Sequence, residues 1–161
     1  RLRKVKKFSC AAVAASIKAQ PIHLAWGSGL PDWDTGGESE LPSTSDMTAE
    51  VGRRRVTQPL FCTPDPAGEI VVSEGRFTVS TEPTNYLYLR FAYDFHDAPD
   101  ATIRELGVFI GTVAKSTTPV GQDYLLPEDI KAPGTLLVYE RIQKLVRSPQ
   151  IRQQFEFVVQ F

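Results

Sequence analysis

The sequence predicts a mainly β protein, an antiparallel β-sandwich or flattened barrel that carries one N-terminal helix. Six to eight short segments are rich in β-branched and aromatic residues, and turn signals separate them at short intervals. Strand-like and helix-like segments do not alternate, as a doubly wound fold would require. We therefore expect an N-terminal helix within residues 1–20 and a single β-rich domain over residues 21–161, with a long loop at about residues 28–50.

Length and composition are those of one ordinary globular domain. The chain has 161 residues, of which 42% are hydrophobic and 23% are charged, and this balance argues against disorder along the whole chain. The formal net charge of −1 gives no overall electrostatic case for nucleic acid. The apolar runs are shorter than the ~18 residues of a membrane-spanning helix. We therefore expect neither nucleic acid nor a membrane as a partner.

The N-terminal segment predicts a basic amphipathic helix over residues 3–19. Apolar side chains recur at helical spacing and form a stripe that is mostly alanine: Phe8, Ala11, Ala12, Ala15 and Ala19. Lys4 and Lys7 lie largely off this stripe, and Pro21 ends the helix. Two interpretations stay open, a helix docked on the domain's own sheet and a protruding helix whose Lys4 and Lys7 contact a neighbouring protein.

A strand at residues 22–26 is followed by a long polar segment, residues 30–48. A loop of this length is usually functional or disordered, and whether it is ordered alone or only by contact with a partner stays open. Its Asp-Trp-Asp sequence at residues 32–34 looks like the start of a calcium loop, but the later ligand positions are out of register. Trp33 is the candidate contact residue, because exposed aromatic side chains often anchor protein interfaces.

Three consecutive arginines, Arg53, Arg54 and Arg55, lead into a strand at residues 56–62. Neighbouring strand residues point to opposite faces of a sheet, which argues against a single phosphate-binding patch. Salt bridges to the preceding acidic loop and ion pairs across a subunit boundary are the two interpretations, since arginine is favoured in interface ion pairs. All three are candidate contact residues.

A hairpin and a long alternating strand are predicted in the middle of the chain. The hairpin joins residues 69–73 to residues 76–81 through Glu74 and Gly75. The strand over residues 86–95 has one wholly apolar or aromatic face, which we assign to the core. The residues of this core face are Leu87, Leu89, Phe91, Tyr93 and Phe95.

The segment at residues 101–112 is the one around which we expect the fold to be organised. Its near-continuous apolar and β-branched residues predict a strand covered on both faces. Arg104 and Glu105 interrupt it and must be paired if they are buried, because an unpaired buried charge is costly. Further strands are predicted at residues 135–146 and 153–161, the second from strict alternation.

The sequence contains no recognisable catalytic or metal-binding motif. No serine, cysteine or carboxylate is placed by a known motif to form a triad with His23 or His96. Cys10 and Cys62 have neither CxxC spacing nor a nearby histidine pair, so we expect two free, buried thiols. We therefore expect no enzyme, no cofactor and no metal.

Four stretches, in this order, resemble segments of small bacteriophage tail, baseplate and tail-fibre-attachment proteins. They are Ile22–Gly29, Ala49–Arg53, Ile103–Phe109 and Phe155–Phe161. Two departures stand out, since Trp26 replaces a residue that is usually small and residues 119–133 are an elaboration. The resemblance implies a structural virion protein at the baseplate, tail tip or fibre attachment, which acts through protein–protein interfaces. It also implies several copies related by virion symmetry, other tail proteins as partners, and assembly in the host cytoplasm.

A carbohydrate- or receptor-binding β-sandwich is the alternative function. Tyr86 and Tyr88 fall on the more polar face of their strand, where they can stack on sugar rings. Arg90 and Asp94 on the same face would supply hydrogen bonds. A glycosidase or peptidase is a weaker third reading, because no pair of carboxylates or activated nucleophile stands out.

Overall fold

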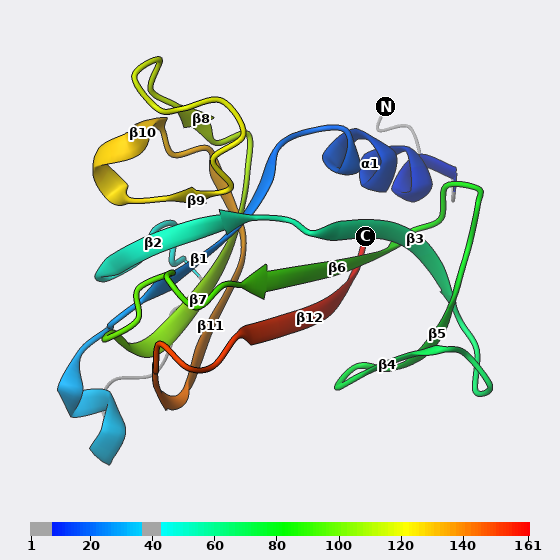
Figure 1. Ribbon diagram of the computed structural model, residues 1–161. Helices are drawn as coiled ribbons and strands as arrows, with labels where there is room; N and C mark the ends of the chain where they lie inside the picture. Colours follow the sequence, from blue (N-terminus) through cyan, green and yellow to red (C-terminus); the bar gives the residue numbers. More distant parts are fainter. Residues whose placement is uncertain (1–7, 37–42) are drawn as a thin grey trace. The chain divides into compact units, whose positions relative to one another are not determined.

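The computed structural model describes residues 8–36 and 43–161, and it confirms the predicted fold class (Figure 1). The protein is mainly β, with antiparallel sheets and one short N-terminal α-helix among its described residues. The described chain forms two compact units. Unit 1 holds the residues up to Gln20 together with Val56–Phe91 and Gln154–Phe161, and unit 2 holds Pro21–Arg55 and Ala92–Gln153. The predicted division at residues 20 and 21 stays a prediction.

Unit 1 contains the helix and a five-stranded sheet of strand order β12-β6-β3-β5-β4. Its elements are α1 (Phe8–Lys18), β3 (Gln58–Pro64), β4 (Ile70–Val72), β5 (Gly75–Val79), β6 (Tyr86–Tyr93) as far as Phe91, and β12 (Gln153–Gln160) from Gln154 onward. The predicted hairpin is confirmed, because β4 and β5 pair antiparallel around the turn that precedes Gly75. Gly75 has a φ of 137°, a backbone conformation that residues with a side chain rarely adopt.

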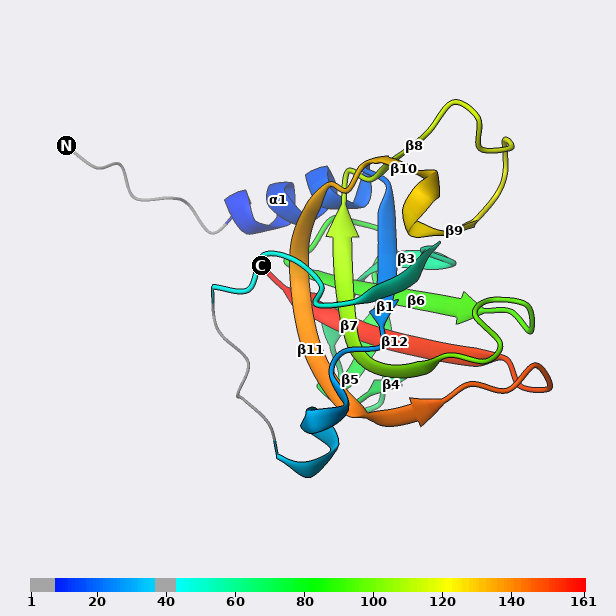
Figure 2. The same ribbon diagram turned by 90° about the vertical axis from the view of Figure 1, so that its left-hand side faces the viewer.

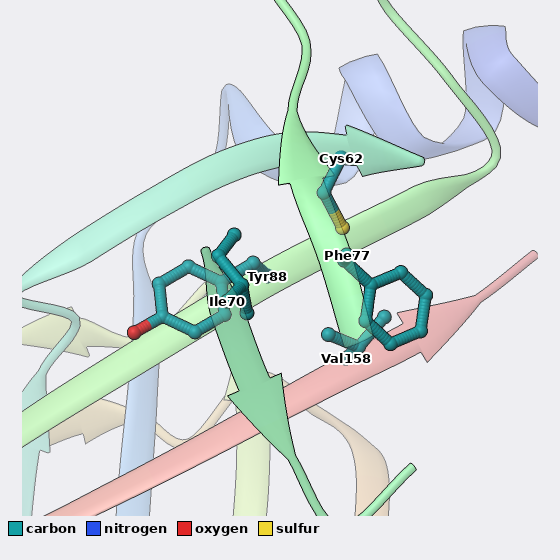
Figure 3. Packing of buried hydrophobic residues seen from close by; sticks show 5 residues of the cluster. All are labelled: Cys62, Ile70, Phe77, Tyr88 and Val158. Atoms are coloured by element: carbon teal, nitrogen blue, oxygen red, sulfur yellow. The ribbon is translucent and has the colours of Figure 1, made fainter. Parts of the chain in front are cut away.

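A cluster of buried apolar side chains forms a core of unit 1 (Figure 3). It joins all five strands of the sheet through Cys62, Ile70, Phe77, Tyr88 and Val158. Along β6 the predicted core residues Leu87, Leu89 and Phe91 are fully buried. Tyr88, on the opposite face of the strand, is also buried, so the face predicted to be amphipathic is covered at this position.

The helix is confirmed over Phe8–Lys18, whereas its predicted first residues, with Lys4 and Lys7, lie outside the described residues. The predicted stripe is wrong, because Ala12 and Ala19 are exposed while Ala14 and Ile17 are buried. Small apolar residues surround most of this helix, so their spacing does not identify its buried side. The Lys18 ammonium lies 5.3 Å from the ring centre of Phe61 in β3, which favours the docked interpretation for residues 8–18.

Unit 2 contains a second five-stranded sheet of order β11-β7-β1-β2-β9 and a small sheet of β8 and β10. Its elements are β1 (Ile22–Gly27), η1 (Pro31–Thr35), β2 (Glu50–Arg55), β7 (Thr102–Ile110), β8 (Val113–Ala114), β9 (Tyr124–Leu125), η2 (Pro127–Asp129), β10 (Ile130–Ala132) and β11 (Thr135–Val146). Figure 2 shows β7 between β11 and β1. The segment expected to organise the fold is therefore a central strand of its sheet.

Two aromatic rings and a close strand contact form much of the core of unit 2. Trp26 stacks on Tyr93 with ring centres 3.6 Å apart, and the Tyr93 hydroxyl donates a hydrogen bond to the carbonyl of Leu24. At Gly107 in β7, a side-chain Cβ would lie only 2.7 Å from the sulfur of Met47. Glycine at this position therefore allows Met47 to pack against the strand.

Candidate contact surfaces

Trp33 is held in place by its own chain. The guanidinium carbon of Arg141 in β11 lies 3.9 Å from the ring centre, within the range of a cation–π contact. On Gly29, which has a φ of 58°, a side chain would overlap the Trp33 ring, so the ring packs closely against this turn. Trp33 is half-buried and lines a hollow of about 250 Å³ together with Ile142 and Lys144.

Asp34 fixes the same short helix to two strands. Its carboxylate accepts hydrogen bonds of 2.8 and 3.0 Å from Nε and Nη2 of Arg104 in β7, a bidentate pair, and lies 3.4 Å from Nζ of Lys144 in β11. The hydrogen bond from Arg104 lowers the pKa of Asp34. The requirement that Arg104 be paired is thus met. Of the two possibilities left open for the loop, the first applies to Pro31–Thr35, because contacts within the chain hold this segment.

Glu105 orders the end of the loop that leads into β2. Its side chain is 0% exposed and accepts hydrogen bonds from the backbone N–H of Ala49 at 2.8 Å and of Thr48 at 3.1 Å. The hydroxyl of Tyr139 donates a third hydrogen bond of 2.8 Å. Burial, together with this contact to Glu105, raises the pKa of Tyr139. The buried charge is therefore satisfied, as the sequence required.

Arg53 lies inside unit 2 with an exposed fraction of 2%. It pairs with Glu50 at 2.5 Å, and its Nη1 donates to the hydroxyl of Thr112 at 2.9 Å and the carbonyl of Pro133 at 2.8 Å. The guanidinium carbon also lies 4.1 Å from the ring centre of Phe109. In this position Arg53 joins strands and loops of its own unit.

The other two arginines lie on opposite faces of β2, as alternation predicts. Arg54 pairs with Asp97 at 2.9 Å. Arg55 is exposed and takes part in none of the ion pairs formed by the described residues. The acidic partners of Arg53 and Arg54 are thus Glu50 and Asp97, which lie outside the loop of residues 30–48, one of the two partners predicted for the run. Of the three candidate contact arginines, Arg55 is the one left at the surface.

The two tyrosines proposed for sugar stacking lie in different surroundings. Tyr88 is 6% exposed, and burial raises the pKa of its hydroxyl. Tyr86 lines a hollow of about 680 Å³ in unit 1, together with Phe77 and the charged residues Glu74 and Arg76. The prediction that both tyrosines can stack on a sugar is therefore wrong for Tyr88, which is buried. Tyr86 remains accessible.

Both cysteines are free thiols, as predicted. Cys62 is fully buried, and burial raises the pKa of its thiol to about 11. Cys10 is only half-buried, so the expectation of two buried thiols is wrong for this residue. Within residues 8–36 and 43–161, no group of three or more His, Cys, Asp or Glu side chains is placed to hold a metal ion. The helices of this described part are too short or too polar to cross a membrane.

His23 is buried in β1, and its pKa is lowered to about 4. Burial is the main cause, and the positive charges of Arg53 and Arg55 add to it, whereas Asp123 acts in the opposite direction. At neutral pH this histidine is uncharged in the folded protein.

The stability of the protein is expected to fall between about pH 6.5 and pH 4 through His23. Because the folded pKa is below the ordinary value of 6.5, the unfolded chain binds the proton first as the pH falls. The contribution is fully present above pH 6.5, and about 3 kcal/mol is lost by pH 4. Urea unfolding of the wild type and of His23→Gln between pH 6.5 and pH 4 measures this loss of stability. The variant should show a smaller pH dependence, while His96→Gln, at an exposed position, should retain the wild-type dependence.

A comparison with protein families gives a match that spans almost the whole chain. A family model described as "Baseplate wedge 3 tail fiber network component" matches residues 5–161. No curated protein matches the chain.

Proposed function

The chain belongs to the baseplate wedge 3 tail fiber network component family, and from this premise we propose that it joins tail proteins through surface contacts centred on Trp33. Membership makes it a structural protein of the bacteriophage tail baseplate, located in the virion tail, and implies interaction with other tail proteins. The proposal adds that the protein acts by binding through protein–protein interfaces, and it names the residues that form them.

The observation that carries the proposal is the preorganised surface around Trp33. Arg141 and Gly29 hold its ring, while Asp34 ties the short helix to β7 and β11. A side chain fixed before binding loses little conformational entropy on association, which favours its use as an anchor. The adjacent hollow of about 250 Å³ offers Ile142 and Lys144 for apolar and charged contacts.

Replacing Trp33 with alanine is expected to reduce binding to tail proteins by about tenfold or more, because aromatic anchors commonly contribute over 1 kcal/mol. The measurement is recovery of a defined complex when the purified protein is mixed with an extract that contains the other tail proteins but lacks this one. Size and composition of the complex are then determined for each variant.

Phe95→Ala is the matched control for this experiment. Phe95 is also half-buried in unit 2 and also has an arginine over its ring, with Arg152 at 4.7 Å. It should assemble like the wild type. Equal loss in both variants, or full recovery with Trp33→Ala, would remove Trp33 from the contact surface.

Several further properties belong to the same proposal. We propose that the protein is present in several copies related by virion symmetry, that it is not an enzyme, and that it neither binds nucleic acid nor inserts into a membrane. We also propose assembly in the host cytoplasm, without metal or cofactor. Lys4 and Lys7 remain proposed contact residues outside the described part of the chain.

Binding of a carbohydrate receptor is the second candidate, and the hollow in unit 1 is the observation that favours it. Tyr86 and Phe77 provide aromatic surface there, and Asp65, Glu74 and Arg76 provide hydrogen-bonding groups. A glycan array probed with wild type and Tyr86→Ala separates the candidates. Selective binding that is lost in the variant would favour the receptor-binding function.

A further inference from the structure

A small polar hollow in unit 2 is lined by His23 of β1 and Arg55 of β2. These residues are directly opposite each other in the antiparallel pairing of β1 and β2, so their side chains share one face of the sheet. Both line a hollow of about 240 Å³, which is completed by loop residues including Thr118 and Gln122. This volume is sufficient for one acidic side chain.

His23 contributes a largely buried imidazole to the lining of this hollow. The residue is 6% exposed, and its Nδ1 has no hydrogen-bond partner. A buried N–H without an acceptor is rarer in proteins than an acceptor without a donor. The neutral ring is therefore expected to carry its proton on Nε2, which makes Nε2–H the donor available to a ligand.

Arg55 contributes an exposed guanidinium outside the ion pairs of the described residues. Other polar groups lining the hollow are already engaged. The hydroxyl of Thr112 bonds the carbonyl of Pro133, and the amide of Gln122 donates to the carbonyl of Tyr124. Asp123 is the nearby acid, and its carbonyl accepts the backbone N–H of Arg55. Arg55 and His23 are thus the hydrogen-bond donors of the hollow that are available to an acceptor from another molecule.

We propose that this hollow binds the carboxylate of an aspartate or glutamate side chain presented by another tail protein. The guanidinium of Arg55 matches a carboxylate in charge and in its planar geometry, and Nε2–H of His23 supplies a further hydrogen bond. The inference rests on the proposed function, and it names the chemistry of one contact that is separate from Trp33.

Acetate serves as the probe for this site, with acetamide as the uncharged control. The chain has two histidines, so the ring nitrogens of His23 can be followed by NMR in protein labelled with nitrogen-15 histidine, with His96 as internal reference. At constant ionic strength, acetate should shift the His23 signals saturably and acetamide should not. Arg55→Gln should weaken acetate binding about tenfold, and Arg55→Lys should weaken it less.

Arg152→Gln is the matched control, because Arg152 is also an exposed arginine of unit 2. It should bind acetate as the wild type does. Equal acetate binding by wild type and Arg55→Gln, or equal shifts of both histidines, would overturn the inference.

The same variants are then tested for recovery of the complex with tail proteins. Reduced recovery with Arg55→Gln supports the inference, whereas wild-type recovery overturns it even if acetate binds. Loss with Trp33→Ala but not with Arg55→Gln would leave the proposed function standing while this inference fails.

Discussion

Replacing Glu105 with alanine is expected to lower the free energy of unfolding by about 3–5 kcal/mol. The carboxylate is fully buried and accepts hydrogen bonds from the backbone of Thr48 and Ala49 and from the hydroxyl of Tyr139. Its removal leaves these donors without their acceptor, and each buried unsatisfied donor costs about 1–3 kcal/mol. The loop before β2 would also lose its attachment to β7.

Urea unfolding followed by tryptophan fluorescence measures this effect. Both tryptophans, Trp26 and Trp33, belong to unit 2, so the signal reports on the unit that contains Glu105. Glu128→Ala is the control, because Glu128 is an exposed glutamate of the same unit, and such surface changes usually stay within about 0.5 kcal/mol. Equal stability of the two variants would contradict the role of Glu105 as an anchor.

Replacing Arg53 with methionine is expected to cost about 3–5 kcal/mol as well. The substitution preserves most of the apolar volume but leaves the carboxylate of Glu50 without its cation, which is the costly outcome for a buried ion pair. The carbonyl of Pro133 and the hydroxyl of Thr112 also lose their donor. The same fluorescence-monitored unfolding gives the difference in free energy.

Arg55→Met is the matched control for Arg53→Met. Both arginines lie on the same face of the same strand, two residues apart, but Arg55 is exposed. Its replacement should change the stability by about 0.5 kcal/mol or less. Similar losses in both variants would show that the two arginines do not differ in their contribution to the fold. Partial recovery on adding Glu50→Gln to Arg53→Met would identify the unpaired carboxylate as the cause.

The strands could be predicted from the sequence because their signals are local. Alternation and β-branched residues identify the strands at residues 86–93 and 153–160, and near-continuous apolar residues identify those at 22–27 and 102–110. The two-residue strands β8 and β9 were missed, because a segment of that length shows no period. Their pairing depends on neighbouring strands that bring them into register.

The surroundings of the candidate contact residues could be predicted only in part, because burial and pairing depend on residues far apart in the chain. Alternation correctly separates Arg54 from its two neighbours but does not reveal that Arg53 is enclosed. Asp34 and Arg104 are 70 positions apart, so no local pattern links them. The requirement that a buried charge be paired was the useful signal, since it pointed to Arg104 and Glu105 before their partners were known.

Amide hydrogen exchange in the isolated protein and in purified tails tests the central claim most directly. If Trp33 anchors a contact with another tail protein, amides of the Pro31–Thr35 segment should exchange about tenfold or more slowly in the assembled tail. Amides of the buried strand β7 are protected in both states and provide the reference. Unchanged exchange at Pro31–Thr35 after assembly would contradict the claim that this surface joins the protein to its neighbours.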